Sequence, residues 1–236
     1  MCGIVGILGK SAVAPKLVDA LKLLEYRGYD SAGIAVLSAD GPPGMRKRAG
    51  KLRVLADNLD DAPIADGGTG IGHTRWATHG GPTDENAHPH LSEDGRLALI
   101  HNGIIENFSE LKAELLEQGV VFLSETDTEV ATHLVAREYE TSGDLTDAMR
   151  VVVNRLEGAF TLLAVHEDAP GVVVAARRNS LAASCISTRY SGVPRPSSDS
   201  WPTSARAHSS CTRRHEAHTV RPARLSASWA QPISAE

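Results

Sequence analysis

Three helix-like segments lie between two groups of strand-like segments, and this order constrains the fold more than any other feature. The helices are expected at about residues 108–118, 127–140 and 144–156. Apolar, strand-like runs precede them (GIVGILG, SAGIAVLSA, TGIGHTR, RLALIHNG) and follow them (FTLLAVH, GVVVAA). Strands grouped at both ends favour an antiparallel, layered α+β domain over strict βαβ alternation.

Helix starts support these boundaries. Asn107 with Glu110, and Thr126 with Glu129, have the spacing of a capping box, which satisfies free amide groups at a helix N-terminus. A further helix is predicted over residues 13–25, where apolar residues recur at helical spacing.

Composition limits the class of protein. A hydrophobic content of 42% can supply a core. Three cysteines without a CxxC pair argue against a disulfide framework, so we expect a reducing cytoplasmic location. No run approaches the roughly 18 apolar residues that span a bilayer, and no leader is evident, so no membrane partner is expected.

The character of the chain changes after residue 180. Residues 181–236 contain 12 serines, seven arginines, no lysine and no apolar periodicity, which predicts disorder. The preceding part is acidic and offers no nucleic-acid surface, and the mixture of Ser, Pro and Trp in the tail does not favour one either. We therefore expect no nucleic-acid partner.

Cys2 follows the start methionine directly. If Met1 is removed, Cys2 carries a thiol and a free α-amine, whose pKa of about 8 lies near the thiol's roughly 8.5. The amine can then take the thiol proton, and one residue can be nucleophile and base together. The alternative is an ordinary small residue behind a start codon.

Three further motifs contain residues suited to binding an amino acid. In GHTRWATHG, the planar fork of Arg75 matches a carboxylate; in HNGIIEN, Asn102 and Gly103 can donate to an oxyanion; in SETDTEV, Asp127 can hold an ammonium group. The alternatives are a surface loop, an Asn-Gly turn and an acidic helix start.

Histidines are dense in the same stretch, which suggests a metal site. They are His73, His79, His88, His90 and His101. Without a helical HExxH pair or partnering cysteines the signal is weak. We expect no metal and no cofactor.

Six ordered motifs resemble the glutaminase domain of the glutamine-dependent fructose-6-phosphate aminotransferase (glucosamine-6-phosphate synthase) family. They are MCGIVG, EYRGYDSAGIAV, GHTRWATHG, NAHPH, HNGIIEN and SETDTEV, and the resemblance runs from residue 1 to about residue 180. It implies a class II glutamine amidotransferase with a four-layer αββα N-terminal-nucleophile (Ntn) hydrolase sandwich. The implied substrate is L-glutamine, which is hydrolysed to glutamate and ammonia.

The resemblance also implies a role for each matching residue. Cys2 would attack the glutamine amide, and Asn102 and Gly103 would form the oxyanion hole. Arg75 would bind the substrate α-carboxylate and Asp127 its α-ammonium. The remaining implied pocket residues are Thr78 and His79, with Trp76 resembling the residue that gates ammonia.

Two other interpretations stay open. The same fold and chemistry occur in amidophosphoribosyltransferases, although these read more like HRGQESAG and HVRYxT where this chain has EYRGYDSAG and HTRWATHG. A damaged domain could also survive as an inactive binding module.

We expect residues 2–180 to form the glutaminase domain, incomplete at its C-terminal end, followed by a disordered tail at residues 181–236. The family's sugar isomerase domains are expected to be absent, so glutamine hydrolysis is the most the chain could do and a stable oligomer is not expected. The abrupt break after AARRNS suggests a shifted reading frame. Reading the other two frames past codon 180 tests this hypothesis.

Overall fold

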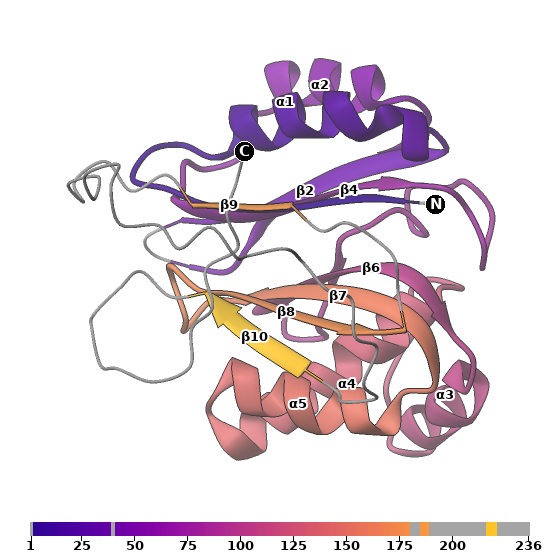
Figure 1. The fold of residues 1–236 in the computed structure, drawn as a ribbon. Coiled ribbons are helices and arrows are strands. Elements are labelled where there is room, and N and C mark those ends of the chain that lie inside the picture. The colour runs from indigo at the N-terminus through magenta and orange to yellow at the C-terminus, as the bar shows by residue number, and fades with distance from the viewer. Residues whose placement is uncertain (1, 39–40, 180–184, 189–215, 221–236) are drawn as a thin grey trace, which may run out of the picture.

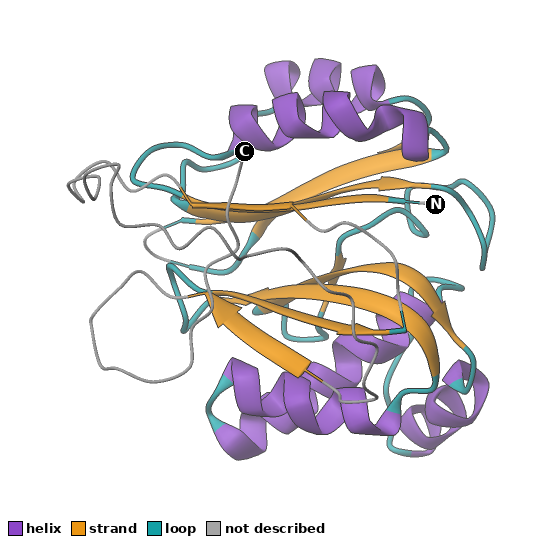
Figure 2. Ribbon diagram, viewed as in Figure 1, coloured by secondary structure: helices purple, strands orange, loops and turns teal. Residues whose placement is uncertain are grey.

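The computed structural model describes residues 2–38, 41–179, 185–188 and 216–220. Two β-sheets are stacked face to face, and helices cover the outer face of each (Figures 1 and 2). This arrangement has four layers, in the order helix, sheet, sheet, helix. It confirms the predicted layered α+β class.

The first sheet contains the N-terminal strands. Its strand order is β3-β2-β4-β1-β9, with all neighbours antiparallel except β1 and β9. The strands are β1 (Gly3–Leu8), β2 (Ser31–Leu37), β3 (Gly44–Ala49), β4 (Thr69–Arg75) and β9 (Cys185–Thr188).

The second sheet is antiparallel throughout, with the order β10-β8-β7-β6-β5. Its strands are β5 (His90–Leu91), β6 (Leu97–Ile105), β7 (Gly158–His166), β8 (Val173–Arg178) and β10 (Glu216–Val220). Strands β6 and β7 pair along their full nine residues.

Two helices pack on the first sheet and three on the second (Figure 1). They are α1 (Ala14–Leu24), α2 (Leu52–Asp61), α3 (Phe108–Glu117), α4 (Asp127–Ser142) and α5 (Leu145–Arg155), and a 3-10 turn, η1 (Glu25–Arg27), follows α1. Neither α2 nor β3 was predicted from the sequence.

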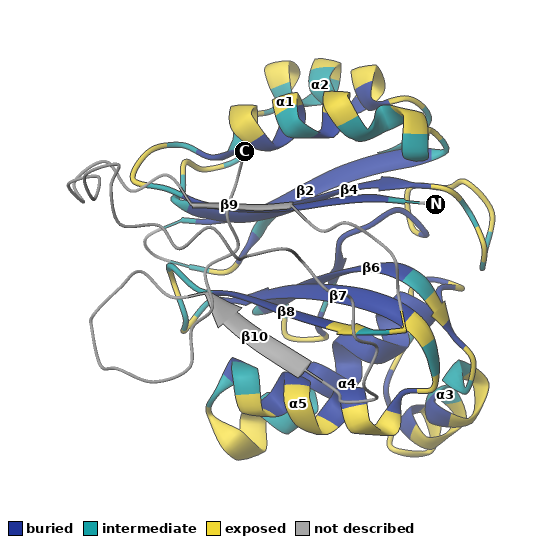
Figure 3. Ribbon diagram, in the orientation of Figure 1, coloured by how far each residue is buried: buried dark blue, intermediate teal, exposed yellow. Residues whose placement is uncertain are grey.

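Three apolar clusters fill the spaces between the layers. Strands β1, β2 and β4 are buried and β3 is half-buried, while the helices expose their outward faces (Figure 3). One cluster lies between the first sheet and α1 and α2, and another between the second sheet and α3 to α5. The third, here called the inner apolar cluster, lies between the sheets. It consists of Ile4, Leu8, Ala35, Leu37, Ile71, Ala98, Ile100, Leu163, Val165, Val173 and Ala175.

One predicted cap is confirmed and one is wrong. Thr126 Oγ1 accepts from Glu129 N at 3.3 Å, at the start of α4. The Asn107 side chain makes no cap hydrogen bond to α3. It binds instead to the last residue of α5 and to the chain that follows, because its Nδ2 donates to Arg155 O at 2.9 Å and its Oδ1 accepts from Glu157 N at 3.0 Å.

Two short strands fall within the range for which the sequence predicts disorder. Strand β9 pairs with β1, and β10 pairs with β8. Strand pairing uses backbone N–H and C=O groups, which every residue except proline supplies in full, so it does not require an apolar side-chain pattern. The rest of residues 181–236 lies outside the described residues, so the disorder there stays a prediction.

In the part of the chain that the structure describes, none of the helices has the length and apolar character required to cross a membrane.

Candidate active site

Cys2 lies immediately before β1, where its sulfur contacts the chain that follows β4. Trp76 N donates to Cys2 Sγ at 3.4 Å, and Sγ lies 3.7 Å from Trp76 O. Burial raises the pKa of the Cys2 thiol, while the hydrogen bond from the Trp76 amide and the charge of Arg75 lower it. Because burial outweighs the other effects, the thiol needs a base to become a nucleophile.

Two hydrogen bonds join the side chain of Asn102 to the backbone of Cys2. Cys2 N donates to Asn102 Oδ1 and Asn102 Nδ2 donates to Cys2 O, both at 3.3 Å. The two residues are 100 positions apart in the sequence. Since an amide NH₂ group has two hydrogens, Asn102 keeps a second donor beside the sulfur-bearing residue.

Gly103 follows Asn102 in β6 with a φ of 138°, a conformation that favours glycine. A Cβ atom there would lie 2.1 Å from Ala159 O. The strand at this point therefore accepts no side chain.

The guanidinium group of Arg75 is buried at the end of β4. Nη1 donates to Gly81 O at 3.0 Å, and Nη2 donates to Gly80 O at 3.2 Å and to His79 O. Burial lowers the pKa of Arg75, while the charges of Cys2 and Asp127 raise it. A substrate carboxylate would share this group with the loop carbonyls or replace some of them.

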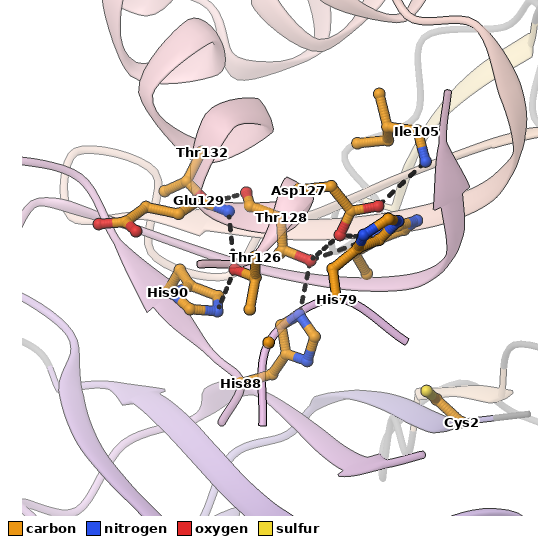
Figure 4. A network of polar contacts seen from close by, with 12 residues as sticks. Cys2, His79, His88, His90, Ile105, Thr126, Asp127, Thr128, Glu129 and Thr132 are labelled. Atoms are coloured by element: carbon orange, nitrogen blue, oxygen red, sulfur yellow. Dashed lines mark hydrogen bonds and ion pairs between the residues drawn. The ribbon is translucent and has the colours of Figure 1, made fainter. Parts of the chain in front are cut away.

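Asp127 is the first residue of α4, and both of its carboxylate oxygens have partners (Figure 4). Oδ2 accepts from Ile105 N at 3.0 Å, and Oδ1 lies 3.5 Å from His101 Nδ1. Burial raises the pKa of Asp127, but the charge and hydrogen bond of His101 and the Ile105 amide outweigh it, so the pKa is lowered. Asp127 is a buried carboxylate that stays ionised.

Buried histidines and the first residues of α4 form what we call the polar cluster. Its members are His73, His88, His90, His101, Thr126, Asp127, Thr128 and Glu129, all at most 5% exposed. It connects the sheets, because His73 Nε2 on β4 lies 2.8 Å from His101 O on β6. His90 Nε2 lies 3.0 Å from Thr126 Oγ1.

Three histidines of the polar cluster are neutral near pH 7. Burial lowers the pKa of His73 to about 3 and holds the pKa values of His88 and His90 well below 6.5. Among the described residues, no group of three or more His, Cys, Asp or Glu has the arrangement of a metal site.

The other predicted pocket residues lie on the loop after β4. Trp76 is 45% exposed, and its ring contacts Tyr29 edge-on, with ring centroids 5.4 Å apart. The His79 ring is half-buried and packs 4.8 Å from Phe108, whereas Thr78 is exposed to solvent. The structure thus brings Cys2, Asn102, Arg75 and Asp127 within electrostatic or hydrogen-bond range. Within the described part of the chain it shows no such contact for Thr78.

Three residues of the motif EYRGYDSAG had no role predicted from the sequence: Arg27, Tyr29 and Asp30. Arg27 Nε donates to Cys2 O at 3.2 Å. Asp30 Oδ2 accepts from Ala77 N at 2.9 Å, and Asp30 N donates to Arg75 O at 3.0 Å. This segment holds both Cys2 and the loop that contacts its sulfur, and the polar residues of the motif were the available signal.

Two surface hollows lie away from Cys2. One, of about 610 Å³, is lined mainly by residues of α3, α4 and α5, and the other, of about 500 Å³, by residues of β3 and α2 and by Asp84 and Glu85. The chemistry of the side chains, and not the size of a hollow, identifies the site.

Comparison with known proteins agrees with this geometry. Residues 73–185 match a family model described as a glutamine amidotransferase domain. Glutamine–fructose-6-phosphate aminotransferase (isomerizing) from Leifsonia xyli subsp. xyli is 66% identical over 180 residues, and that from Streptomyces coelicolor is 63% identical. Each alignment covers 76% of this chain, which spans 29% of the length of these relatives.

Solved structures share the fold. Glutamine phosphoribosylpyrophosphate amidotransferase from B. subtilis is 31% identical with a TM-score of 0.62. The allosteric regulatory enzyme of purine biosynthesis is 32% identical with a TM-score of 0.63. Each likeness covers 75% of this chain and 37% of the other. The predicted fold class is confirmed.

Proposed function

We propose that this chain hydrolyses the side-chain amide of L-glutamine with Cys2 as the nucleophile, because residues 73–185 match a family model described as a glutamine amidotransferase domain. The observation that carries the proposal is the pair of hydrogen bonds between Cys2 and Asn102. These bonds place the side-chain amide of Asn102 beside Cys2, although the two residues are 100 positions apart in the sequence.

The reaction has two balanced stages. In the first, Cys2 Sγ attacks the amide carbon and the Cys2 α-amine takes the thiol proton. The amine then passes this proton to the leaving nitrogen, and the C–N bond breaks to release ammonia and leave a thioester. In the second, water attacks the thioester, releasing glutamate and restoring the thiol. The amine exists only once Met1 has been removed.

Each binding role follows the charge of the group it would meet. The second Nδ2 hydrogen of Asn102 and the backbone amide of Gly103 would donate to the oxyanion. Arg75 would pair with the α-carboxylate and Asp127 with the α-ammonium of glutamine. The pocket wall would include Trp76, Thr78 and His79.

We further propose that the ammonia serves the synthesis of glucosamine 6-phosphate from fructose 6-phosphate in the cytoplasm. The 66% identity to a glutamine–fructose-6-phosphate aminotransferase supports this acceptor. The likeness to a phosphoribosylpyrophosphate amidotransferase keeps a second candidate, in which the same glutaminase serves phosphoribosylpyrophosphate.

The test measures glutamate release and covalent labelling by a glutamine-like diazoketone. Intact mass spectrometry first shows whether Met1 is absent. We expect labelling at Cys2 and glutamate release, both abolished by Cys2→Ala.

The matched control is the double variant Cys185→Ala and Cys211→Ala, which removes the other two thiols. We expect it to be labelled and to release glutamate like the wild type. A folded protein that lacks Met1 but neither releases glutamate nor is labelled would leave the binding-module interpretation.

A further inference from the structure

Strand β6 presents chemically different residues on its two faces. Ala98 and Ile100 belong to the inner apolar cluster, and Asn102 continues the same face toward Cys2. Leu97 and Leu99 face the helices on the other side. His101 continues that second face and so reaches the first turn of α4.

The contacts of His101 lead directly to the Asp127 carboxylate. His101 Nδ1 lies 3.1 Å from Thr128 Oγ1 and 3.5 Å from Asp127 Oδ1. Thr128 Oγ1 lies 2.6 Å from His88 Nε2 (Figure 4). The second oxygen, Oδ2, is held by the Ile105 amide. Oδ1 also lies 3.5 Å from Thr128 Oγ1, so the carboxylate is oriented by the Ile105 amide, His101 and the Thr128 hydroxyl.

The surrounding charges assign the direction of these hydrogen bonds. A lone pair on His101 Nδ1 would repel the carboxylate, so Nδ1 carries the hydrogen. Thr128 then accepts from His101 and donates to His88 Nε2, which a neutral His88 can accept. In this arrangement His88 carries its own hydrogen on Nδ1, which has no hydrogen-bond partner among the described residues.

We propose that His101 is a positioning residue that fixes the Asp127 carboxylate for the α-ammonium group of the substrate, and that His101 thereby sets the preference for amides with an α-amino group. This inference rests on the proposed function, in which Asp127 binds that ammonium. His101 itself contacts neither the reacting amide nor Cys2 in this arrangement.

The test compares two substrates, glutamine and the monoamide of glutaric acid, which is glutamine without its α-amino group. For the wild type we expect kcat/KM to be much higher for glutamine. For His101→Ala we expect KM for glutamine to rise about tenfold, with kcat little changed and with the monoamide unaffected. The ratio of the two kcat/KM values then falls about tenfold.

Two conservative variants locate the effect at one atom. In His101→Asn the side-chain nitrogen can take the place of Nδ1, whereas in His101→Gln it takes the place of Nε2. We expect His101→Asn to keep most of the preference and His101→Gln to lose it. This pair carries the test if His101→Ala does not fold.

His166→Ala is the matched control, because His166 is also buried on the second sheet but contacts Tyr139 and Asp168 instead of the site. It should lower stability and leave the substrate ratio unchanged. Equal ratios in the Asn and Gln variants, or equal losses on both substrates, would overturn the inference. A wild type inactive on glutamine would overturn the proposed function itself, before any variant is measured.

Discussion

The inner apolar cluster and the polar cluster are both buried, but they contain opposite types of side chain. The inner apolar cluster holds only aliphatic side chains, whereas the polar cluster gathers four histidines, two carboxylates and two threonines. Strand β6 contributes to both, through Ile100 and His101. The difference teaches that one pair of sheets can separate stability from chemistry along the length of a single strand.

The two clusters contribute differently to the free energy of folding. Burial of aliphatic groups stabilises by about 25 cal/mol per Å². Burial of polar groups costs free energy unless hydrogen bonds compensate it. Glu129 shows the compensation, because its carboxylate accepts from Leu123 N, Ser124 N and the Ser124 hydroxyl at 2.6–2.8 Å. Such hydrogen bonds offset the cost of burying the polar cluster, which therefore stabilises the fold less than the inner apolar cluster does.

The largest effect should come from the apolar side of the comparison. Ile100 is fully buried, two residues before Asn102 on the same face of β6. Ile100→Ala should lower the free energy of unfolding by about 2–5 kcal/mol, since it removes buried groups and leaves a cavity. Denaturant unfolding measures this, with kcat expected near wild type below the melting range. A large loss of kcat in the folded variant would contradict the separation.

Asn102→Ala should show the reverse pattern. Loss of an oxyanion donor lowers kcat by about 100- to 1,000-fold. The free energy of unfolding should fall by only about 1–3 kcal/mol, because the bonds to Cys2 are lost. Steady-state glutamate release and denaturant unfolding of the same sample give both quantities. If kcat fell less than tenfold, Asn102 would not be the oxyanion donor.

The polar cluster should make the free energy of unfolding decrease at acid pH. Burial lowers the pKa of His73 from 6.5 to about 3, so below pH 6.5 the unfolded chain binds a proton that the folded chain does not. Stability from this group is complete above pH 6.5 and is lost as the pH falls toward 3, by about 1.4 kcal/mol per pH unit.

His73→Gln removes this titration and can keep the bond to His101 O, so the slope of stability against pH should become shallower by that amount. Unfolding at several pH values between 4 and 7 measures it. Ile100→Ala is the control and should keep the wild-type slope. An unchanged slope in His73→Gln would show that His73 does not titrate as described.

The smallest effect should come from loss of the hydrogen bond between Asp30 and the loop after β4. Asp30→Ala removes the acceptor of the Ala77 amide and should cost about 1 kcal/mol of stability. Because the loop carries the Trp76 amide that donates to Cys2 Sγ, Cys2 alkylation by iodoacetamide should slow a few-fold. Asp57→Ala, at an exposed ion pair on α2, is the control and should change neither quantity. An unchanged alkylation rate in Asp30→Ala would show that the loop after β4 does not affect the reactivity of Cys2.

Much of the fold could be predicted from local patterns, and the failures have physical causes. Thr126 was found as a cap because its partner, Glu129, is three residues away. Asn107 has the same spacing to Glu110 but binds Arg155 and Glu157, about fifty positions distant, and no local pattern reports such a partner.

The two elements that were not predicted, β3 and α2, differ in how clearly the sequence indicates them. Strand β3 reads GMRKRA, without the alternation of a half-buried strand, and forms at a sheet edge through backbone pairing. Helix α2 had a usable signal, because Leu52, Leu55, Ala56 and Leu59 recur at helical spacing.

The site was predictable only in part. The chemistry of Cys2, Arg75, Asn102 and Asp127 could be argued from residue types, but their proximity came from the resemblance, since Cys2 and Asn102 are 100 residues apart. The contact of His101 with Asp127 depends on which face of β6 each residue occupies, and that requires the structure.

The two faces of β6 also limit how this strand can change during evolution. Successive side chains alternate, so the loss or gain of one residue between Leu97 and Ile100 would exchange the faces of every residue after it. His101 would then point toward Cys2 and Asn102 toward α4, although the composition would hardly change. Point substitutions in β6 alter one cluster at a time, whereas a single-codon insertion or deletion would disable both at once.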